Sequence, residues 1–224
     1  MAEEPFAEEL PAGLRLAGDI ADAVREAAEQ GELPVVVAGS CAIAAIGAIA
    51  GLGAGTRFAW FAAHPGLYTP VTTRTGLFEG MALAAACGRA WRHVVAEEAR
   101  LLEPARFEDT VLFGTRDIDD AEAALITSAG IARAATVADL KSKLGGAGSV
   151  YVHLDMDVHD ALEVRTDASA IPGGPGVEEV RAALTAIANI KALAITGLDP
   201  AAPDAGRAAD IAIEYVLAIA GDGA

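Results

Sequence analysis

The sequence has few cysteines, few basic residues and few aromatic residues, and the first two shortages exclude classes of protein. Cys41 and Cys87 are too few for a disulfide scaffold or an all-thiolate zinc cage, so we expect a reducing compartment and a cytoplasmic location. Lys and Arg number 16 against 32 Asp and Glu, a formal net charge of -16. Such an acidic surface repels phosphate groups, so we expect neither nucleic acid nor a membrane as a partner.

Membrane-directed segments are also missing. Residues 1–10 are acidic and lack the basic and apolar parts of a secretory signal, so we expect none. The stretch from Val35 to Thr56 is uncharged and long enough to cross a bilayer. Its centre is nevertheless Ala, Gly and Ser, and it begins with three consecutive valines. This pattern predicts a buried strand followed by a helix of small residues.

Hydrophobic residues make up 53% of the 224 residues, enough to build a buried core. Apolar spacing predicts an amphipathic helix over residues 8–30. Apolar runs predict strands at 34–38, 57–62, 110–114, 149–156 and 191–196. Stretches rich in Ala and Leu predict helices at 41–50, 79–100, 118–129, 137–144, 176–189 and 205–219. Alternating strands and helices are typical of a single α/β domain with a parallel sheet, here covering residues 1–224.

Two long loops, 63–78 and 157–175, follow predicted strands at the edge where open α/β sheets bind ligands. The most informative segment, His153 to Asp160 (HLDMDVHD), ends an apolar strand. Alternation along a strand predicts that His153, Asp155, Asp157 and His159 share one face. Neighbouring carboxylates on that face could bind a divalent ion. The alternative is a strand end where acidic side chains are simply solvated.

Two more candidates follow other predicted strands. His64 lies in WFAAHPGLYTP, directly after the strand at 57–62. Cys41 lies where the strand at 34–38 turns into its helix, and the helix N-terminus could lower its pKa. A loop histidine and a small buried cysteine also have purely structural uses.

Together these segments resemble the arginase/agmatinase (ureohydrolase) family. In that family three motifs, Gly-Gly-Asp-His, Asp-Ala-His-x-Asp and Asp-x-Asp-x-x-Asp-Pro, supply six ligands to a dinuclear manganese site. The similar segments here are AGSCAIAAIG, WFAAHPGLYTPVTTRTG and HLDMDVHD, and the resemblance runs from about residue 10 to 218. It implies a three-layer α/β/α fold with a mostly parallel sheet. It also implies that Tyr68, Thr72, Thr73 and Arg74 belong to a substrate loop.

The sequence departs from the family at several ligand positions. Cys41 replaces the histidine of the first motif, and Ala62 and Gly66 replace the two aspartates of the second. His64, Asp155 and Asp157 remain. Asp160 keeps the last aspartate of the third motif, and His159 adds an imidazole beside it.

Two further positions differ outside the ligand motifs. Glu79 stands where the family often has a histidine. Gly197 stands where arginases have a glutamate that binds guanidinium. We therefore expect neither a normal dimanganese cluster nor arginase activity, and we expect a ligand larger or less basic than a guanidinium compound.

Three interpretations of the site stay open. In the first, His64, Asp155 and Asp157, helped by His159 or Cys41, hold one Mn or Zn ion. In the second, no metal is needed, and Cys41 is a nucleophile beside His64 in a hydrolase or transferase. In the third, the chain is a non-catalytic partner subunit or ligand-binding scaffold. We adopt a divergent hydrolase of a C–N or related bond in a small molecule, with Cys41, His64, Glu79 and Asp160 as candidate catalytic residues.

The resemblance also bears on assembly. Family members usually begin with a strand and a glycine-rich loop, and here the first apolar strand comes only at Pro34. We expect a sheet without the family's first outer strand, whose edge is covered by the N-terminal helix or by another subunit. A homo-oligomer is the expectation, with a hetero-oligomer containing an intact paralogue as the alternative.

Overall fold

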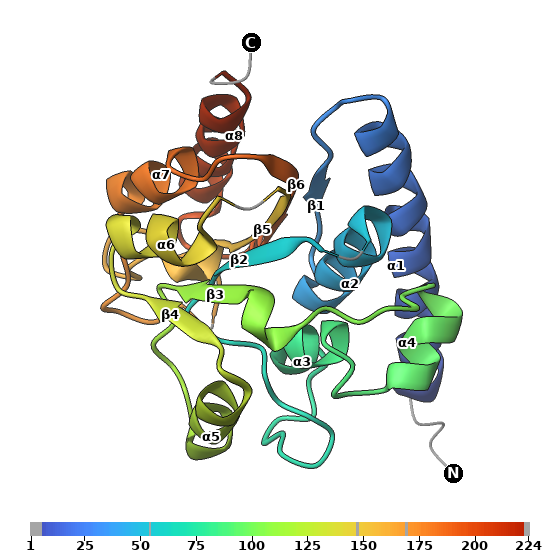
Figure 1. Cartoon of the computed structure of the whole chain (residues 1–224). Coiled ribbons are helices and arrows are strands. Elements are labelled where there is room, and N and C mark those ends of the chain that lie inside the picture. Colours follow the sequence, from blue (N-terminus) through green and yellow to red (C-terminus); the bar gives the residue numbers. More distant parts are fainter. Residues whose placement is uncertain (1–5, 54, 147, 169, 222–224) are drawn as a thin grey trace.

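A computed structural model describes residues 6–53, 55–146, 148–168 and 170–221. Its strands form one sheet in the order β1-β6-β5-β2-β3-β4, and every pairing is parallel (Figure 1). The strands are β1 (Val35–Val37), β2 (Arg57–Phe61), β3 (Thr110–Phe113), β4 (Ala132–Ala134), β5 (Val150–Asp155) and β6 (Ile190–Thr196). The predicted α/β class with a parallel sheet is confirmed.

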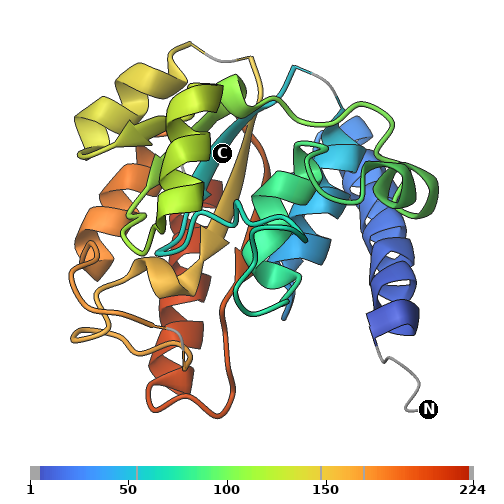
Figure 2. The same ribbon diagram turned by 90° about the horizontal axis from the view of Figure 1, so that it is seen from below.

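Helices cover both faces of this sheet and give the predicted three layers (Figures 1 and 2). One face carries α1 (Phe6–Glu29), α2 (Cys41–Leu52), α3 (Ala82–Ala86) and α4 (Arg92–Glu98). The other face carries α6 (Val137–Leu144), α7 (Val177–Thr185) and α8 (Ala205–Gly221). Helix α5 (Asp120–Ala129) lies beside β4, and the short 3-10 helices are η1 (Glu79–Met81), η2 (Phe107–Asp109) and η3 (Met156–Val158).

The alternation of side chains along β5 separates two hydrophobic cores. Tyr151 belongs to the core shared with α2, whereas Val152 and Leu154 belong to the core shared with α7 and α8. All residues of β5 are buried, as expected for a central strand covered on both faces. The odd-numbered residues of β5, including His153 and Asp155, therefore face the α2 layer.

The structure corrects three secondary-structure predictions. Strand β4 was not predicted, because its three residues, Ala-Arg-Ala, contain no apolar run and lie at the sheet edge. The single helix predicted over 79–100 is divided into η1, α3 and α4. A turn with positive φ at Gly88 and Trp91 separates the last two helices. The helix predicted over 176–189 ends at Thr185.

The uncharged stretch from Val35 to Thr56 folds as predicted, with β1 followed by α2. Among the described residues, no helix combines the length and the apolar character needed to cross a membrane. Strand β1 lies at one edge of the sheet, and the side chain of Val37 is 66% exposed there. Helix α1 packs along α2 (Figure 1), and Val37 stays exposed in its presence. Coverage of this edge by another subunit stays a prediction.

Helices α1 and α2 approach closely because α2 has glycines on the face that meets α1. A Cβ atom added at Gly47 would lie 2.7 Å from the Ala17 carbonyl oxygen and 2.7 Å from Ile20 Cγ2. Gly51 has the same relation to the Ala21 carbonyl oxygen and Val24. These glycines allow the backbones to come together, which larger residues would prevent.

We expect Gly47→Ala to lower the free energy of unfolding by about 1–3 kcal/mol, because the added methyl group overpacks the α1–α2 contact. Gly206→Ala is the matched control, since this helical glycine in α8 has open space around its Cβ position. The control should be neutral or slightly stabilising. Urea unfolding measures both, and equal stability of the two variants would contradict the close-approach argument.

Candidate active site

A cavity of about 310 Å³ opens at the carboxyl edge of the sheet. Its described lining includes five acidic residues, one histidine, one cysteine and two large aromatic residues, and it includes no Lys or Arg. The lining is Cys41, Trp60, Ala62, His64, Gly66, Tyr68, Thr75, Leu77, Glu79, Gly80, Asp117, Glu122, Asp155 and Asp157. Of the two long loops, 63–78 supplies much of this wall, whereas 157–175 supplies only Asp157.

His64 follows β2 and lies between two carboxylates. Its Nδ1 is 2.6 Å from Asp157 Oδ2, and its Nε2 is 3.4 Å from Asp117 Oδ2. The hydrogen bond to Asp157 is the main cause that raises the pKa of His64, and burial opposes this effect. Asp157 also accepts a hydrogen bond from the Ala63 backbone N–H at 2.8 Å. One carboxylate thus fixes both the histidine ring and the loop that carries it.

Cys41 begins α2, and its thiol is directed at the end of β5. The Sγ–H group donates to Asp155 Oδ2 at 2.8 Å, and Sγ lies 3.1 Å from Thr196 Oγ1. Burial, and then the nearby Asp155 charge, raise the pKa of the Cys41 thiol well above its usual value. The effect expected from the helix N-terminus is therefore outweighed. Burial likewise raises the pKa of Asp155, and the charge of Asp157 adds to this.

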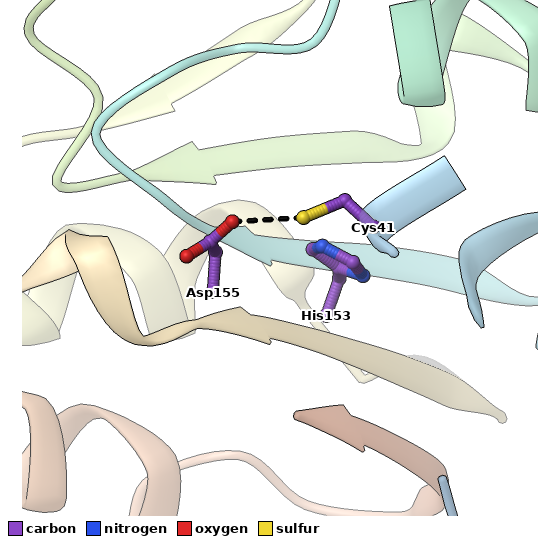
Figure 3. A group of neighbouring side chains, drawn as sticks. All are labelled: Cys41, His153 and Asp155. Atoms are coloured by element: carbon purple, nitrogen blue, oxygen red, sulfur yellow. Dashed lines mark hydrogen bonds between the residues drawn. The ribbon is translucent and has the colours of Figure 1, made fainter. Parts of the chain in front are cut away.

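His153 completes a compact group with Cys41 and Asp155 (Figure 3). One ligand atom from each of the three residues lies within 4.8 Å of the other two, the only such group among the described residues. The His153 ring is fully buried and stacks on Trp60, with ring centroids 3.9 Å apart. Burial lowers the pKa of His153 to about 3, so the imidazole is neutral.

Glu79 lies at the cavity mouth and holds the start of α2. It accepts hydrogen bonds from Ser40 Oγ at 2.6 Å and from the Ala42 backbone N–H at 3.2 Å. Ser40 in turn caps α2 by accepting from the Ile43 N–H. Since Cys41 lies between Ser40 and Ala42, Glu79 fixes the position of the thiol through the backbone.

Of the predicted substrate loop, Tyr68 lines the cavity, whereas Thr72, Thr73 and Arg74 are not among its lining residues. Burial, with a hydrogen bond to Asp119, raises the pKa of Tyr68 to about 12, so the phenol stays neutral. The Thr72 hydroxyl accepts from the Thr69 N–H, and the Thr73 hydroxyl accepts from the Gly76 N–H. These hydroxyls shape the loop locally.

The prediction that His159 shares a face with Asp155 is wrong, because η3 ends the alternation of β5. His159 is fully buried on the α8 side, where Nε2 lies 2.8 Å from Tyr215 Oη and Nδ1 lies 2.8 Å from the Met156 carbonyl oxygen. It therefore lies apart from the three-residue group. Asp160 does not line the cavity either, and its carboxylate accepts from the Leu162 N–H in the loop after β5.

Arg116 positions the segment after β5, a role that no sequence pattern indicates. Its guanidinium nitrogens lie 2.6–3.1 Å from six backbone carbonyl oxygens, which share its five N–H groups, and burial lowers its pKa. The acceptors are Gly114, Asp157, Val158, His159, Ile171 and Pro172. A planar group with several N–H donors can satisfy many carbonyls at once, and only the fold brings these together.

Asp155 also has glycine as a close neighbour. Gly197 follows β6 with φ +68°, and a Cβ atom there would overlap the Asp155 carboxylate. No glutamate side chain could leave this backbone position without moving Asp155. The absence of a side chain at Gly197 therefore leaves the space that the Asp155 carboxylate occupies.

A parallel sheet between two layers of helices, with acidic residues and a histidine at its carboxyl edge, defines an α/β protein with a ligand site at that edge. The model of the arginase family matches residues 8–220, and the chain belongs to this family. All six positions that the resemblance aligns with the manganese ligands line the cavity, including Cys41, Ala62 and Gly66. Ala62 and Gly66 offer no ligand side chain.

Among curated proteins, the chain is similar to an N(omega)-hydroxy-L-arginine amidinohydrolase from Streptomyces lavendulae. The two are 30% identical over 208 residues, which cover 87% of this chain and 72% of the relative. The chain is also 25% identical to an arginase from Bacillus caldovelox, over 91% of this chain and 73% of the arginase. The structure of Bacillus cereus arginase superposes with a TM-score of 0.85 at 23% identity, over 94% of this chain and 78% of that chain.

We expect Gly197→Ala to destabilise the fold more than Gly130→Ala, which serves as its matched control. Both glycines have φ +68°, but Gly130 has no atom near its Cβ position. Left-handed backbone costs about 1–2 kcal/mol for alanine at either site. Overlap with Asp155 adds about 1–3 kcal/mol at Gly197 alone. Urea unfolding at neutral pH measures this difference, and equal losses would show that Asp155 moves aside without cost.

Proposed function

We propose that this chain is a hydrolase that cleaves a C–N bond of a small cationic molecule of the amidino type. The observation that supports this most directly is the cavity with five acidic residues and no Lys or Arg among its described lining. His64 is the only basic side chain in this described lining, so the carboxylates outnumber the positive charge available and favour a cationic ligand. This argues against the less basic ligand expected from Gly197. Charge on the ligand is matched by Glu79 and Asp117 along the wall, whereas burial raises the pKa of Glu122 to about 7.

His64 is the residue best placed to move a proton. Its Nδ1 bonds to Asp157, which leaves Nε2, near Asp117, to meet a ligand in the cavity. In the proposed reaction, water adds to the amidino carbon and passes one proton to Asp117, while Nε2 of His64 donates a proton to the leaving nitrogen. The C–N bond then breaks to give an amine and a urea-type product, and the proton on Asp117 returns to His64. Asp157 orients the ring and stabilises its protonated form.

The family's dimanganese cluster does not fit these residues. Two Mn²⁺ ions carry four positive charges, while the aligned positions offer only Asp155 and Asp157 as carboxylates, and Asp157 already binds His64. A single Mn or Zn ion is compatible with the remaining donors. When bound, it would polarise a water molecule for attack on the amidino carbon. Arginase activity of the family's dinuclear type is therefore not part of the proposal.

The metal-free thiol interpretation is less well supported. The Cys41 thiol donates to Asp155 and contacts Thr196, and its pKa is raised, so it is not a thiolate at neutral pH. A cysteine nucleophile needs the thiolate form and a nearby base. The hydrogen-bonding partners of His64 are Asp157 and Asp117, which do not include this thiol.

The cytoplasmic location and the homo-oligomer stay predictions that belong to this proposal. A non-catalytic subunit is the alternative, and it is favoured by the missing ligand side chains at Ala62 and Gly66. Turnover separates the two functions, because a scaffold would bind a ligand without converting it.

We expect cationic amidino compounds to bind and neutral analogues to bind weakly. Arginine, N(omega)-hydroxy-L-arginine and agmatine form the first panel, each compared with the analogue in which a neutral ureido group replaces the guanidinium. Binding to the folded state raises the unfolding temperature in proportion to log concentration above Kd. Equal shifts for charged and neutral members would contradict a cation-selective cavity.

We expect His64→Gln and Asp157→Asn to lower turnover by about 100-fold or more, because both remove the oriented proton donor. Product amine is measured by mass spectrometry, with Zn or Mn supplied in turn. His93→Gln is the control, since His93 is exposed on α4. Unchanged turnover in both site variants would exclude this mechanism, and no turnover in the parent chain with any panel member, although it binds, would favour the scaffold.

A further inference from the structure

The group of Cys41, His153 and Asp155 offers three different donor atoms that lie within 4.8 Å of one another. The three residues come from the start of α2 and from β5, so the fold alone brings them together (Figure 3). Thr196 at the end of β6 lies beside them, with its hydroxyl 3.1 Å from the thiol and 3.5 Å from His153 Nε2. Cys41 and Asp155 also line the cavity, so one side of the group is open to a ligand.

The three side chains are an acid, a thiol and an imidazole in a largely buried position, where a charged acid or thiolate would need a positive partner. A carboxyl group and a thiol share a hydrogen bond deep in the domain, and no Lys or Arg is among the described lining of the cavity. A divalent cation would be balanced by one thiolate and one carboxylate, with a neutral imidazole as third ligand. The resulting centre has no net charge, which suits a buried site.

The surroundings of His153 are those of a metal ligand. Its Nδ1 lies 3.0 Å from the hydroxyl of Tyr151, a fully buried residue. An Nδ1–H that donates to this oxygen leaves a lone pair on Nε2, which lies 3.5 Å from Thr196 Oγ1, the hydroxyl that also contacts Cys41. Such a hydrogen bond to the other ring nitrogen usually fixes the orientation of a ligating histidine. Stacking on Trp60 holds the plane of the ring.

We propose that Cys41, His153 and Asp155 bind a single zinc ion whose fourth position faces the cavity. A set of thiolate, imidazole and carboxylate suits zinc, whereas manganese prefers oxygen ligands in an octahedral arrangement. On binding, the Cys41 thiol releases its proton to solvent as the Zn–S bond forms. His64 and Asp157 then serve the substrate and are not ligands. This site deepens the proposed function by assigning the metal ligands. The role of the ion in catalysis rests on the proposed function, whereas zinc binding itself does not.

The test is metal content of the full chain, purified without chelator and then offered equal concentrations of zinc and manganese. We expect about one zinc per chain and little manganese by elemental analysis. His153→Gln and Cys41→Ser should each lower bound zinc by at least about 10-fold. His159→Gln and Cys87→Ser are the matched controls and should retain it. Preference for manganese, absence of bound metal in the folded parent chain, or equal zinc in site and control variants would each overturn the proposal.

Cobalt substitution tests the thiolate ligand without depending on how much zinc a variant keeps. A cobalt–thiolate bond gives an intense near-ultraviolet charge-transfer band, which we expect in the parent chain and in Cys87→Ser but not in Cys41→Ser. Circular dichroism confirms that each variant is folded. A band that survives in folded Cys41→Ser would contradict the assignment. Neither measurement uses an amidino substrate, so the zinc site and the hydrolase proposal can fail separately.

Discussion

Burial of the Asp155 carboxyl group at the end of the central strand β5 is the constraint on which the site depends. An acidic group so deeply placed needs partners, and the chain supplies the Cys41 thiol and the Asp157 backbone N–H, which donates at 2.9 Å. It also needs space, which Gly197 provides by having no side chain. The residues around Asp155 thus have to be small, polar or able to donate a hydrogen bond.

The parallel sheet concentrates these requirements in one place. Carboxyl ends of β1, β2, β5 and β6 lie at the same edge, so Cys41, His64, Asp155 and Thr196 come together although they are far apart in sequence. Glu79 and Arg116 form hydrogen bonds with backbone groups at this edge. Glu79 bonds to the start of α2, and Arg116 bonds to the loop after β5. Both residues fix the backbone segments that carry site residues. Arg116 is not among the lining residues, so its charge does not offset the acidic cavity wall.

An excess of acidic groups in a cavity connects the two proposals. A cationic substrate and a divalent ion would both relieve repulsion among carboxylates, and the two proposals assign them to different parts of the cavity. The proposed substrate contacts are Glu79 and Asp117, which are in the cavity lining, whereas Asp155 is grouped with His153 and Cys41. In the zinc proposal, the departure from the family pattern at Cys41 replaces an imidazole by a thiolate, a ligand that suits zinc better than manganese.

The sequence by itself determined the α/β class, the parallel sheet and five of the six described strands, because buried strands and amphipathic helices leave strong hydrophobic periods. It also located Cys41, His64, Asp155 and Asp157 at one edge of the sheet. It missed β4, because three residues are too few to show a hydrophobic pattern. It misplaced His159, because the turn of η3 moves that side chain to the opposite face of the sheet. The grouping of His153 with Cys41 and the carbonyl contacts of Arg116 were decided by the tertiary structure, since both depend on distances between segments that no local pattern encodes.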